Sequence, residues 1–330
     1  MEKKITKIIK IENVEITARL FGSFDINTKM LESAFSVSIK NRSDGEGDAI
    51  CISGDDQSKV NAAAKAIEAL KKLARSNEVL TEQQVGYVIS MVQDGNDGEL
   101  DGLDDECICI TTNGKPIKPK TVGQKRYVDN IQKNTIVFGI GPAGTGKTFL
   151  AVAMAVRALR QKQVNRIILT RPAIEAGEKL GFLPGDLQSK IDPYLRPLYD
   201  ALFDMFGGES FSRYMEKGII EVAPLAYMRG RTLDEAFIIL DEAQNTTSEQ
   251  IKMFLTRLGN ESRMVITGDI TQIDLPDPRK SGLVEAVKIL KGIDDIGIHR
   301  FSEKDVVRHK LVQDIIKAYE KFNEGRKNHA

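Results

Sequence analysis

The chain has 330 residues, of which 41% are apolar and 28% are charged, a composition typical of globular proteins and a length sufficient for about two domains. Basic and acidic residues number 47 each, so overall charge gives no sign of nucleic-acid binding, and no apolar run approaches the ~20 residues of a membrane-spanning helix. Three cysteines without zinc-ligand spacing exclude a disulfide framework and favour a reducing compartment, so we expect a cytoplasmic protein.

Residues 1–76 are predicted to form a small α+β module. Hydrophobic alternation indicates strands at 14–20, 36–40 and 49–53. A short helix is expected around 29–32, and a long alanine-rich helix is expected to follow Asp55 or Asp56 and to end near residue 74. The predicted order is β-α-β-β-α, and the module is small enough to serve mainly for interactions.

Residues 77–120 are predicted to be a helix followed by an acidic linker. The helix is expected from Thr81 to about Gln93, and the stretch 94–106 then contains seven acids and no base, which is typical of a solvated connection. A single larger domain is predicted over 121–322, and the polar residues 323–330 are predicted to be a frayed tail.

A phosphate-binding loop stands at the start of the larger domain. Residues 141–148 match G-x-x-x-x-G-K-[ST] at every fixed position, between the apolar run 135–138 and a helix-forming segment. Lys147 is expected to reach the β- and γ-phosphates of a nucleoside triphosphate, and the Thr148 hydroxyl to bind Mg²⁺. The predicted nucleotide-binding residues of the loop are Gly141, Pro142, Ala143, Gly144, Thr145, Gly146, Lys147 and Thr148.

Apolar strands alternate with amphipathic helices throughout this domain. The predicted helices are 189–206, 248–258 and 283–290, and the predicted strands are 135–138, 166–169, 219–222, 237–240, 264–267 and 297–301. This alternation predicts an α/β fold in which a parallel sheet is sandwiched by helices, a RecA-like P-loop NTPase. Ligands of such sheets lie at the carboxyl ends of the strands.

Polar residues that end two of these strands extend the predicted site. Asp241 follows an apolar strand and suits an outer Mg²⁺ partner, and the adjacent Glu242 can orient and deprotonate the attacking water. The next strand ends near Asp269 and Gln272, and the Gln272 amide is expected to sense the γ-phosphate. Paired carboxylates favour hydrolysis over phosphate transfer to a small molecule.

Gln124 precedes the first strand of the larger domain. Its amide has a donor and an acceptor that match the Hoogsteen edge of adenine. No Asn-Lys-x-Asp sequence, which would read guanine, occurs in the chain. ATP is therefore the expected nucleotide.

These motifs together resemble the PhoH-like ATPase family, whose nucleotide domain is related to that of superfamily-one helicases. The resemblance extends from Thr111 to about Tyr319. It is carried by Gly123–Tyr127, Gly141–Thr148, Leu169–Ala173 with Glu178–Gly185, Tyr227–Thr232, Asp241–Asn245, Thr267–Gln272 and Asp305–His309. It implies Gln124 at adenine, Lys147 and Thr148 at phosphate and Mg²⁺, Asp241 and Glu242 as Walker B residues, and Gln272 as γ-phosphate sensor. It also suggests that Thr170 and Arg171 lie near a nucleic-acid face.

Only about 58 residues follow Gln272, too few for the second ATPase domain of a monomeric helicase. An arginine that stabilises the γ-phosphate must therefore come from this tail or from a neighbouring subunit, and Arg308 and Arg300 are the candidates. A homo-oligomer is expected, and the resemblance points to a hexameric ring. It also suggests an endoribonuclease partner in ribosomal RNA processing.

The amino-terminal module resembles a divergent KH-type RNA-binding domain, as in one branch of this family. KH domains clamp nucleotides with a G-x-x-G loop, whereas this chain has Gly22-Ser23-Phe24-Asp25. RNA binding and a purely oligomerising or protein-docking role both stay open for the module. For the whole chain the expectation is a Mg²⁺-dependent ATPase that acts on RNA, and the alternative is an ATP-gated adaptor that recruits a partner.

Overall fold

The computed structural model describes residues 4–43, 48–75, 79–101, 103, 107–172, 187–308, 311–312, 315 and 318–319. They form two compact units, one made of Met1–Glu106 and Val307–Ala330 and the other of Cys107–Val306. Across these described ranges, no helix has the length and apolar character needed to cross a membrane.

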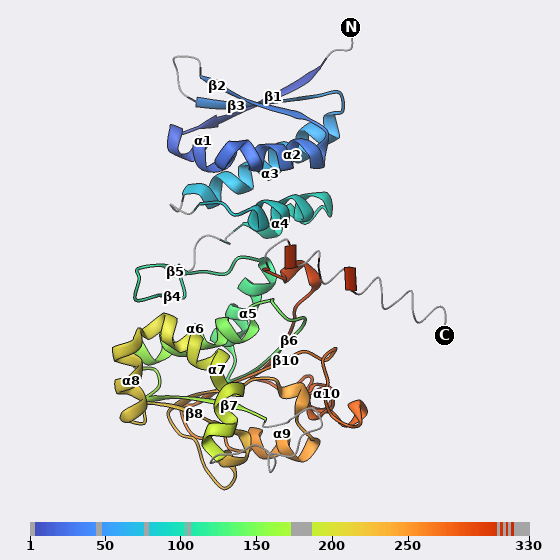
Figure 1. Ribbon diagram of the computed structural model, residues 1–330. Helices are drawn as coiled ribbons and strands as arrows, with labels where there is room; N and C mark the ends of the chain where they lie inside the picture. Colours follow the sequence, from blue (N-terminus) through green and yellow to red (C-terminus); the bar gives the residue numbers. More distant parts are fainter. Residues whose placement is uncertain are drawn as a thin grey trace. The chain divides into compact units, whose positions relative to one another are not determined.

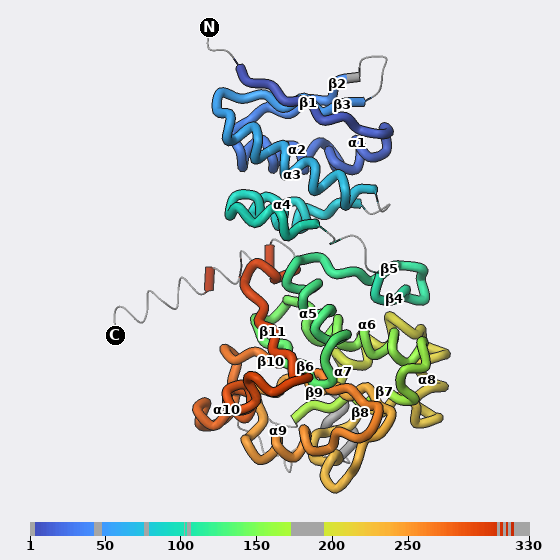
Figure 2. Tube along the Cα trace, turned by 180° about the vertical axis from the view of Figure 1, so that it is seen from behind, coloured from blue at the N-terminus to red at the C-terminus, as the bar shows by residue number. Residues whose placement is uncertain are grey.

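The first unit contains a three-stranded antiparallel sheet with strand order β1-β3-β2. Helices α1, α2 and α3 lie on one face of this sheet (Figure 2). The elements are β1 (Ile5–Ile11), α1 (Val14–Phe21), α2 (Ile26–Phe35), β2 (Ser38–Ser43), β3 (Asp48–Gly54), α3 (Gln57–Arg75) and α4 (Glu82–Gln93). The predicted helix after Thr81 is confirmed as α4, and Thr81 forms a capping box with Gln84.

The predicted strand at 14–20 is wrong, because this segment is helix α1. The Asn13 side chain caps it by accepting a hydrogen bond from the Ile16 amide at 2.9 Å, and Ile16 and Leu20 are buried one turn apart. The first strand instead lies at Ile5–Ile11, where no strand was predicted. The observed order is therefore β-α-α-β-β-α rather than β-α-β-β-α.

The second unit is built on a six-stranded parallel sheet of order β11-β6-β10-β9-β7-β8. Its strands are β6 (Ile136–Ile140), β7 (Arg166–Arg171), β8 (Ile220–Pro224), β9 (Ala236–Leu240), β10 (Arg263–Gly268) and β11 (Ile296–Arg300), with a separate antiparallel pair β4 (Cys109–Ile110) and β5 (Pro116–Ile117). Its helices are α5 (Val122–Lys133), α6 (Lys147–Arg160), α7 (Leu187–Phe206), α8 (Gly208–Glu216), α9 (Ser248–Leu255) and α10 (Gly282–Ile289). The predicted α/β fold, its six strands and its three helices are confirmed.

Both faces of the large sheet are covered by helices (Figure 1). Val137 and Val265 are buried in the core with residues of α5, α6 and α7, whereas their neighbours Phe138 and Ile266 are buried with residues of α9 and α10. Successive strand residues point to opposite faces, so a sheet that is buried on both sides needs uninterrupted apolar strands. This packing fixes the carboxyl ends of β6, β7, β9 and β10 beside one another.

Candidate functional site

The first residue of the loop between β6 and α6 contacts the end of β10 and the residue that follows β11. The Gly141 amide donates to the Gly268 carbonyl at the end of β10 at 3.1 Å. A Cβ on Gly141 would lie 2.6 Å from the Cβ of Phe301, which follows β11, so only glycine fits here without displacing that residue. The Thr145 hydroxyl closes the loop by donating to the Pro142 carbonyl at 2.9 Å.

Lys147 and Thr148 are the first two residues of α6, as the loop motif predicts. The Lys147 ammonium donates to the carbonyls of Gly141 and Pro142 at 2.6 and 2.8 Å, so this buried cation lies within the curve of the loop. Gly146 precedes the helix with φ of +79°, a left-handed conformation that favours glycine. The helix N-terminus and the ammonium together give the loop the positive potential that a phosphate needs.

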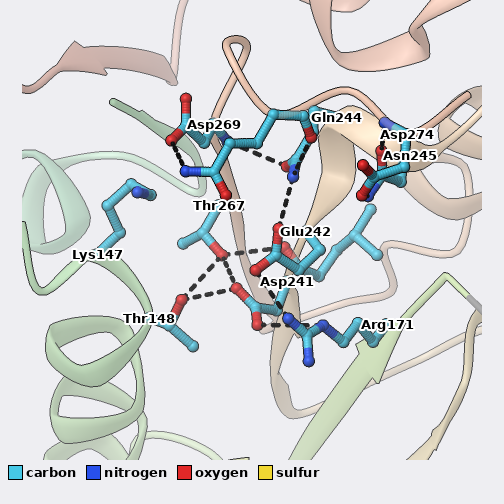
Figure 3. A network of polar contacts seen from close by, with 12 residues as sticks. Lys147, Thr148, Arg171, Asp241, Glu242, Gln244, Asn245, Thr267, Asp269 and Asp274 are labelled. Carbon is cyan, nitrogen blue, oxygen red and sulfur yellow. Dashed lines mark hydrogen bonds and ion pairs between the residues drawn. The ribbon is translucent and has the colours of Figure 1, made fainter. Parts of the chain in front are cut away.

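Three oxygen groups converge beside the start of α6. The Thr148 and Thr267 hydroxyls both donate to Oδ1 of Asp241, at 2.6 and 2.7 Å (Figure 3). Asp241 follows β9 and is almost fully buried, and Thr267 lies in the neighbouring strand β10. Hydroxyl and carboxylate oxygens are the hard ligands that Mg²⁺ prefers, so this donor set fits the predicted ion.

Glu242 has both carboxylate oxygens engaged. Arg171, the last residue of β7, donates from Nη2 to Oε1 of Glu242 at 2.7 Å, and Gln244 donates from Nε2 to Oε2 at 2.5 Å. The Arg171 Nε also lies 3.6 Å from Oδ2 of Asp241, so one guanidinium contacts both carboxylates (Figure 3). Glu242 has φ of +53°, a conformation that is uncommon for a non-glycine residue and that occurs at functional sites.

Gln244 links the Glu242 carboxylate to the loop after β10. Its Oε1 accepts from the Asp269 amide at 3.0 Å, and its Nε2 also donates to the Gln272 carbonyl at 3.1 Å. The Gln272 side chain donates to the Asp269 carboxylate at 2.9 Å. Because Gln244 is 1% exposed, this amide is a rigid connection between the ends of β9 and β10.

Gln124 lies against the phosphate loop from helix α5. Its Oε1 accepts from the Lys120 amide at 2.7 Å, and its Nε2 donates to the Thr145 carbonyl within the loop at 3.0 Å. Thr121 caps α5 by accepting from the Gln124 amide at 3.1 Å and donates in turn to the buried Asp305 carboxylate at 2.7 Å. Gln124 thus supports the loop, and its predicted contact with adenine stays a prediction.

The two candidate arginines lie in different units. Arg300 ends β11, where its Cα is paired with that of Ile140, the residue before the loop, and its side chain is exposed. Arg308 belongs to the first unit, and its carbonyl accepts a hydrogen bond from the Gln83 side chain. The role of each arginine stays a prediction. The family-like positions 173, 178–185 and 309 lie outside the described residues.

The structure adds three contacts to the predicted site. Thr267 supplies a second hydroxyl at Asp241, Gln244 joins Glu242 to the loop after β10, and Arg171 pairs with Glu242. The sequence signal for Gln244 was its place two residues after Glu242 at the end of an apolar strand. Thr267 ends a predicted strand and Arg171 lies two residues after another, but nothing in the sequence says which strands are neighbours.

A family model and several curated proteins match most of this chain. A family model described as "PhoH-like protein" matches residues 116–320. A "PhoH-like protein" of Mycobacterium tuberculosis (strain H37Rv) is 54% identical over 94% of the chain and 86% of its own length, and one of Bacillus subtilis (strain 168) is 52% identical over 95% and 97%. "Protein PhoH" of Escherichia coli (strain K12) is 41% identical over 81% of the chain and 73% of its own length.

One solved structure is a more distant match. The "Sulfolobus solfataricus SWI2/SNF2 ATPase core in complex with dsDNA" covers 56% of this chain and 45% of that one, at 16% identity and a TM-score of 0.33. A likeness of this strength has no bearing on fold or function.

Proposed function

The chain belongs to the PhoH-like protein family, and from this premise we propose that it is a Mg²⁺-dependent ATPase that couples hydrolysis to the movement or remodelling of RNA. Family membership and the phosphate-loop fold support an ATPase. The observation that carries the proposal is the paired Asp241 and Glu242, which lie beside Thr148 at the foot of the loop. In such a pair one carboxylate can bind the metal ion while the other accepts the proton.

In this proposal each residue of the site has a separate role in hydrolysis. Lys147 neutralises charge on the β- and γ-phosphates, and the loop amides bind the phosphate oxygens. A Mg²⁺ ion held by Thr148 and Asp241 would supply further charge neutralisation on the phosphates. Glu242 orients the attacking water and accepts its proton at a carboxylate oxygen. Gln272 reports whether the γ-phosphate is present, and Gln124 selects adenine.

The RNA role rests on the family's relation to helicases and on the resemblance of the amino-terminal module to a KH-type domain. A single ATPase core favours a homo-oligomer, a hexameric ring by resemblance, in which Arg300 or Arg308 acts on the γ-phosphate of a neighbouring subunit. An RNA-processing endoribonuclease is the proposed partner. The three free cysteines fit the reducing cytoplasm.

The test is ATP turnover by the full chain with Mg²⁺, in the presence and absence of oligo(U). We expect oligo(U) to raise the turnover number of the wild type. Glu242→Gln is expected to abolish turnover and to keep ATP binding, because it removes the proton acceptor and keeps the shape of the side chain. Glu216→Gln is the matched control, since that exposed carboxylate ends α8 and has no part in the site.

Two outcomes would contradict the proposal in different ways. Turnover that persists in Glu242→Gln would refute the assigned base. A wild type that hydrolyses ATP but neither binds nor responds to oligo(U) would refute the RNA coupling and favour an ATP-gated adaptor. A sedimentation measurement of a fully active monomer with ATP would refute the proposed subunit interface.

A further inference from the structure

The proposed base, Glu242, forms an ion pair with Arg171. Arg171 Nη2 lies 2.7 Å from Oε1 of Glu242, and Gln244 Nε2 lies 2.5 Å from Oε2, so neither carboxylate oxygen is without a donor (Figure 3). The same guanidinium approaches Asp241, where Nε and Oδ2 are 3.6 Å apart. Arg171 therefore bridges the residue proposed to activate water and the residue proposed to hold Mg²⁺.

This pairing opposes the proposed chemistry of Glu242. A carboxylate that takes a proton from water needs an oxygen lone pair directed at that water. A charge-assisted bond from a guanidinium is about twice as strong as a neutral hydrogen bond, so it fixes the rotation of the carboxylate and draws its negative charge towards Arg171. Glu242 can act as a base at full strength only after this ion pair has loosened.

The guanidinium of Arg171 is also able to bind a phosphate group. The guanidinium is a planar fork that binds phosphate with two parallel hydrogen bonds, as it binds a carboxylate. Its side chain is 19% exposed and that of Glu242 is 38% exposed, so the ion pair lies at the solvent boundary rather than in the core. A phosphate group that arrives from solvent can therefore compete with Glu242 for the same donors.

We propose that Arg171 is a positioning residue that restrains Glu242, and that a backbone phosphate of single-stranded RNA releases the restraint by taking over the guanidinium. The inference rests on the proposed function, and it gives the RNA dependence of hydrolysis an atomic cause. The exchange is one ion pair for another, so no covalent bond changes and no proton moves in the release itself. Gln244 keeps Glu242 attached to the loop after β10 throughout.

The test compares Arg171→Ala with the wild type by steady-state ATP turnover with and without oligo(U). We expect the basal turnover number of Arg171→Ala to rise about tenfold, the effect of removing about 1.4 kcal/mol of restraint. Stimulation by oligo(U) is expected to disappear, and KM for ATP to stay unchanged, because Arg171 forms its ion pairs with Glu242 and Asp241 at the carboxyl end of β9. Arg171→Lys keeps the charge without the fork and should be intermediate.

The matched control is Arg231→Ala. Arg231 also forms an ion pair with a glutamate, donating to both oxygens of Glu221 at 2.6 and 2.7 Å, but away from the phosphate loop. Its loss should leave both the basal rate and the stimulation unchanged. Adding Glu242→Gln to Arg171→Ala should abolish the raised turnover, which shows that the extra rate comes from the same base.

The outcomes separate this inference from the proposed function. A wild type that oligo(U) does not stimulate overturns the RNA coupling and, with it, the release step. A stimulated wild type together with an unchanged or lowered basal rate in both Arg171→Ala and Arg171→Lys overturns only the restraint. A general loss of folding cannot mimic the expected result, because it lowers the turnover number and does not raise it.

Discussion

Gly123 lies against Asp305, and for a Gly123→Ala substitution helix propensity predicts a gain in stability whereas packing predicts a loss. Gly123 lies in the first turn of α5, where propensity alone predicts that alanine stabilises the helix by up to about 1 kcal/mol. A Cβ at this position, however, would lie 2.2 Å from Oδ1 and 2.5 Å from Oδ2 of Asp305. The carboxylate would have to move, and it is buried and already bonded.

The magnitude follows from what Asp305 binds. Its carboxylate accepts from the Thr121 hydroxyl at 2.7 Å, from the Ser302 amide at 2.9 Å and from the Ser302 hydroxyl at 3.1 Å. Losing one hydrogen bond to a buried charged group costs about 1.5–3 kcal/mol, and the propensity gain offsets up to about 1 kcal/mol of it. With the overlap included, we expect Gly123→Ala to lower the free energy of unfolding by about 2 kcal/mol.

A double-mutant cycle in the full chain tests this reasoning, with the free energy of unfolding taken from urea transitions. In the Asp305→Ala background the added methyl has room, so Gly123→Ala should there be neutral or stabilising by about 0.5–1 kcal/mol. The coupling energy between the two positions should therefore be about 2–3 kcal/mol. A Gly123→Ala variant that is more stable than the wild type, or equally destabilised in both backgrounds, would refute the steric argument.

Three further predictions follow from the site and its surroundings. Thr267→Val, which removes the second hydroxyl at Asp241, should raise the Mg²⁺ concentration for half-maximal turnover about 10–100-fold, measured by Mg²⁺ titration at saturating ATP; an unchanged midpoint would refute its role. Burial, opposed by the charge of Asp305, lowers the pKa of His299 below its ordinary 6.5, so the folded state binds a proton less readily than the unfolded chain. The contribution of neutral His299 to the free energy of unfolding should be complete above pH 6.5 and should be lost as the pH falls to the lowered pKa of the folded state. His299→Phe, which suits the aromatic contacts with Tyr127 and Phe301, should make the free energy of unfolding, measured by unfolding curves, less dependent on pH in this range. Burial raises the pKa of the Cys109 thiol to about 11, so iodoacetamide near neutral pH should label the exposed Cys107 first, as peptide mass spectrometry would show; equal rates would contradict the packing of β4.

The sheet of the second unit was predictable because its strands meet one strong requirement. Both faces are covered, so the central strands β6 and β9 are apolar throughout, and the turns around Gly141 and Gly268 mark where β6 and β10 end. The phosphate loop was predictable for a related reason. Its glycines are needed by the backbone, as the overlap of a Gly141 Cβ with Phe301 shows.

The strand prediction at 14–20 is wrong because this sequence satisfies the strand period and the helix period at once. Ile16, Ala18 and Leu20 alternate as in a strand, but Ile16 and Leu20 are also four residues apart, which places them on one face of a helix. Asn13 favours the helix, because its side chain accepts a hydrogen bond from the Ile16 amide and so caps the helix. Strand β1 was missed because its exposed residues, among them Lys7 and Ile8, do not alternate cleanly by polarity.

The contacts at Glu242 could not be predicted because they depend on strand order, which leaves no mark on local sequence. Thr170 is paired with Leu240 because β7 lies beside β9, and this register brings Arg171 next to Asp241 and Glu242. Likewise Ile266 is paired with Leu240 because β10 lies on the other side of β9, and this places Thr267 at Asp241. A different order of the same six strands would separate these side chains.

The phosphate loop and Glu242 are held in place by different kinds of contact. We therefore expect that ATP binding and ATP turnover can be changed separately. The loop is fixed by backbone bonds and packing, from Gly268 at the end of β10, from Phe301 and from the Gln124 amide. Glu242 is instead held by side chains at a partly exposed edge, and its partner Arg171 can exchange one anion for another. Variants at the supports of the loop should therefore change mainly the affinity for ATP, whereas variants at Arg171 should change mainly the turnover number. For Gln124→Ala we expect weaker ATP binding and an unchanged turnover number at saturating ATP. This result would show that ATP affinity and the rate of hydrolysis depend on different parts of the fold.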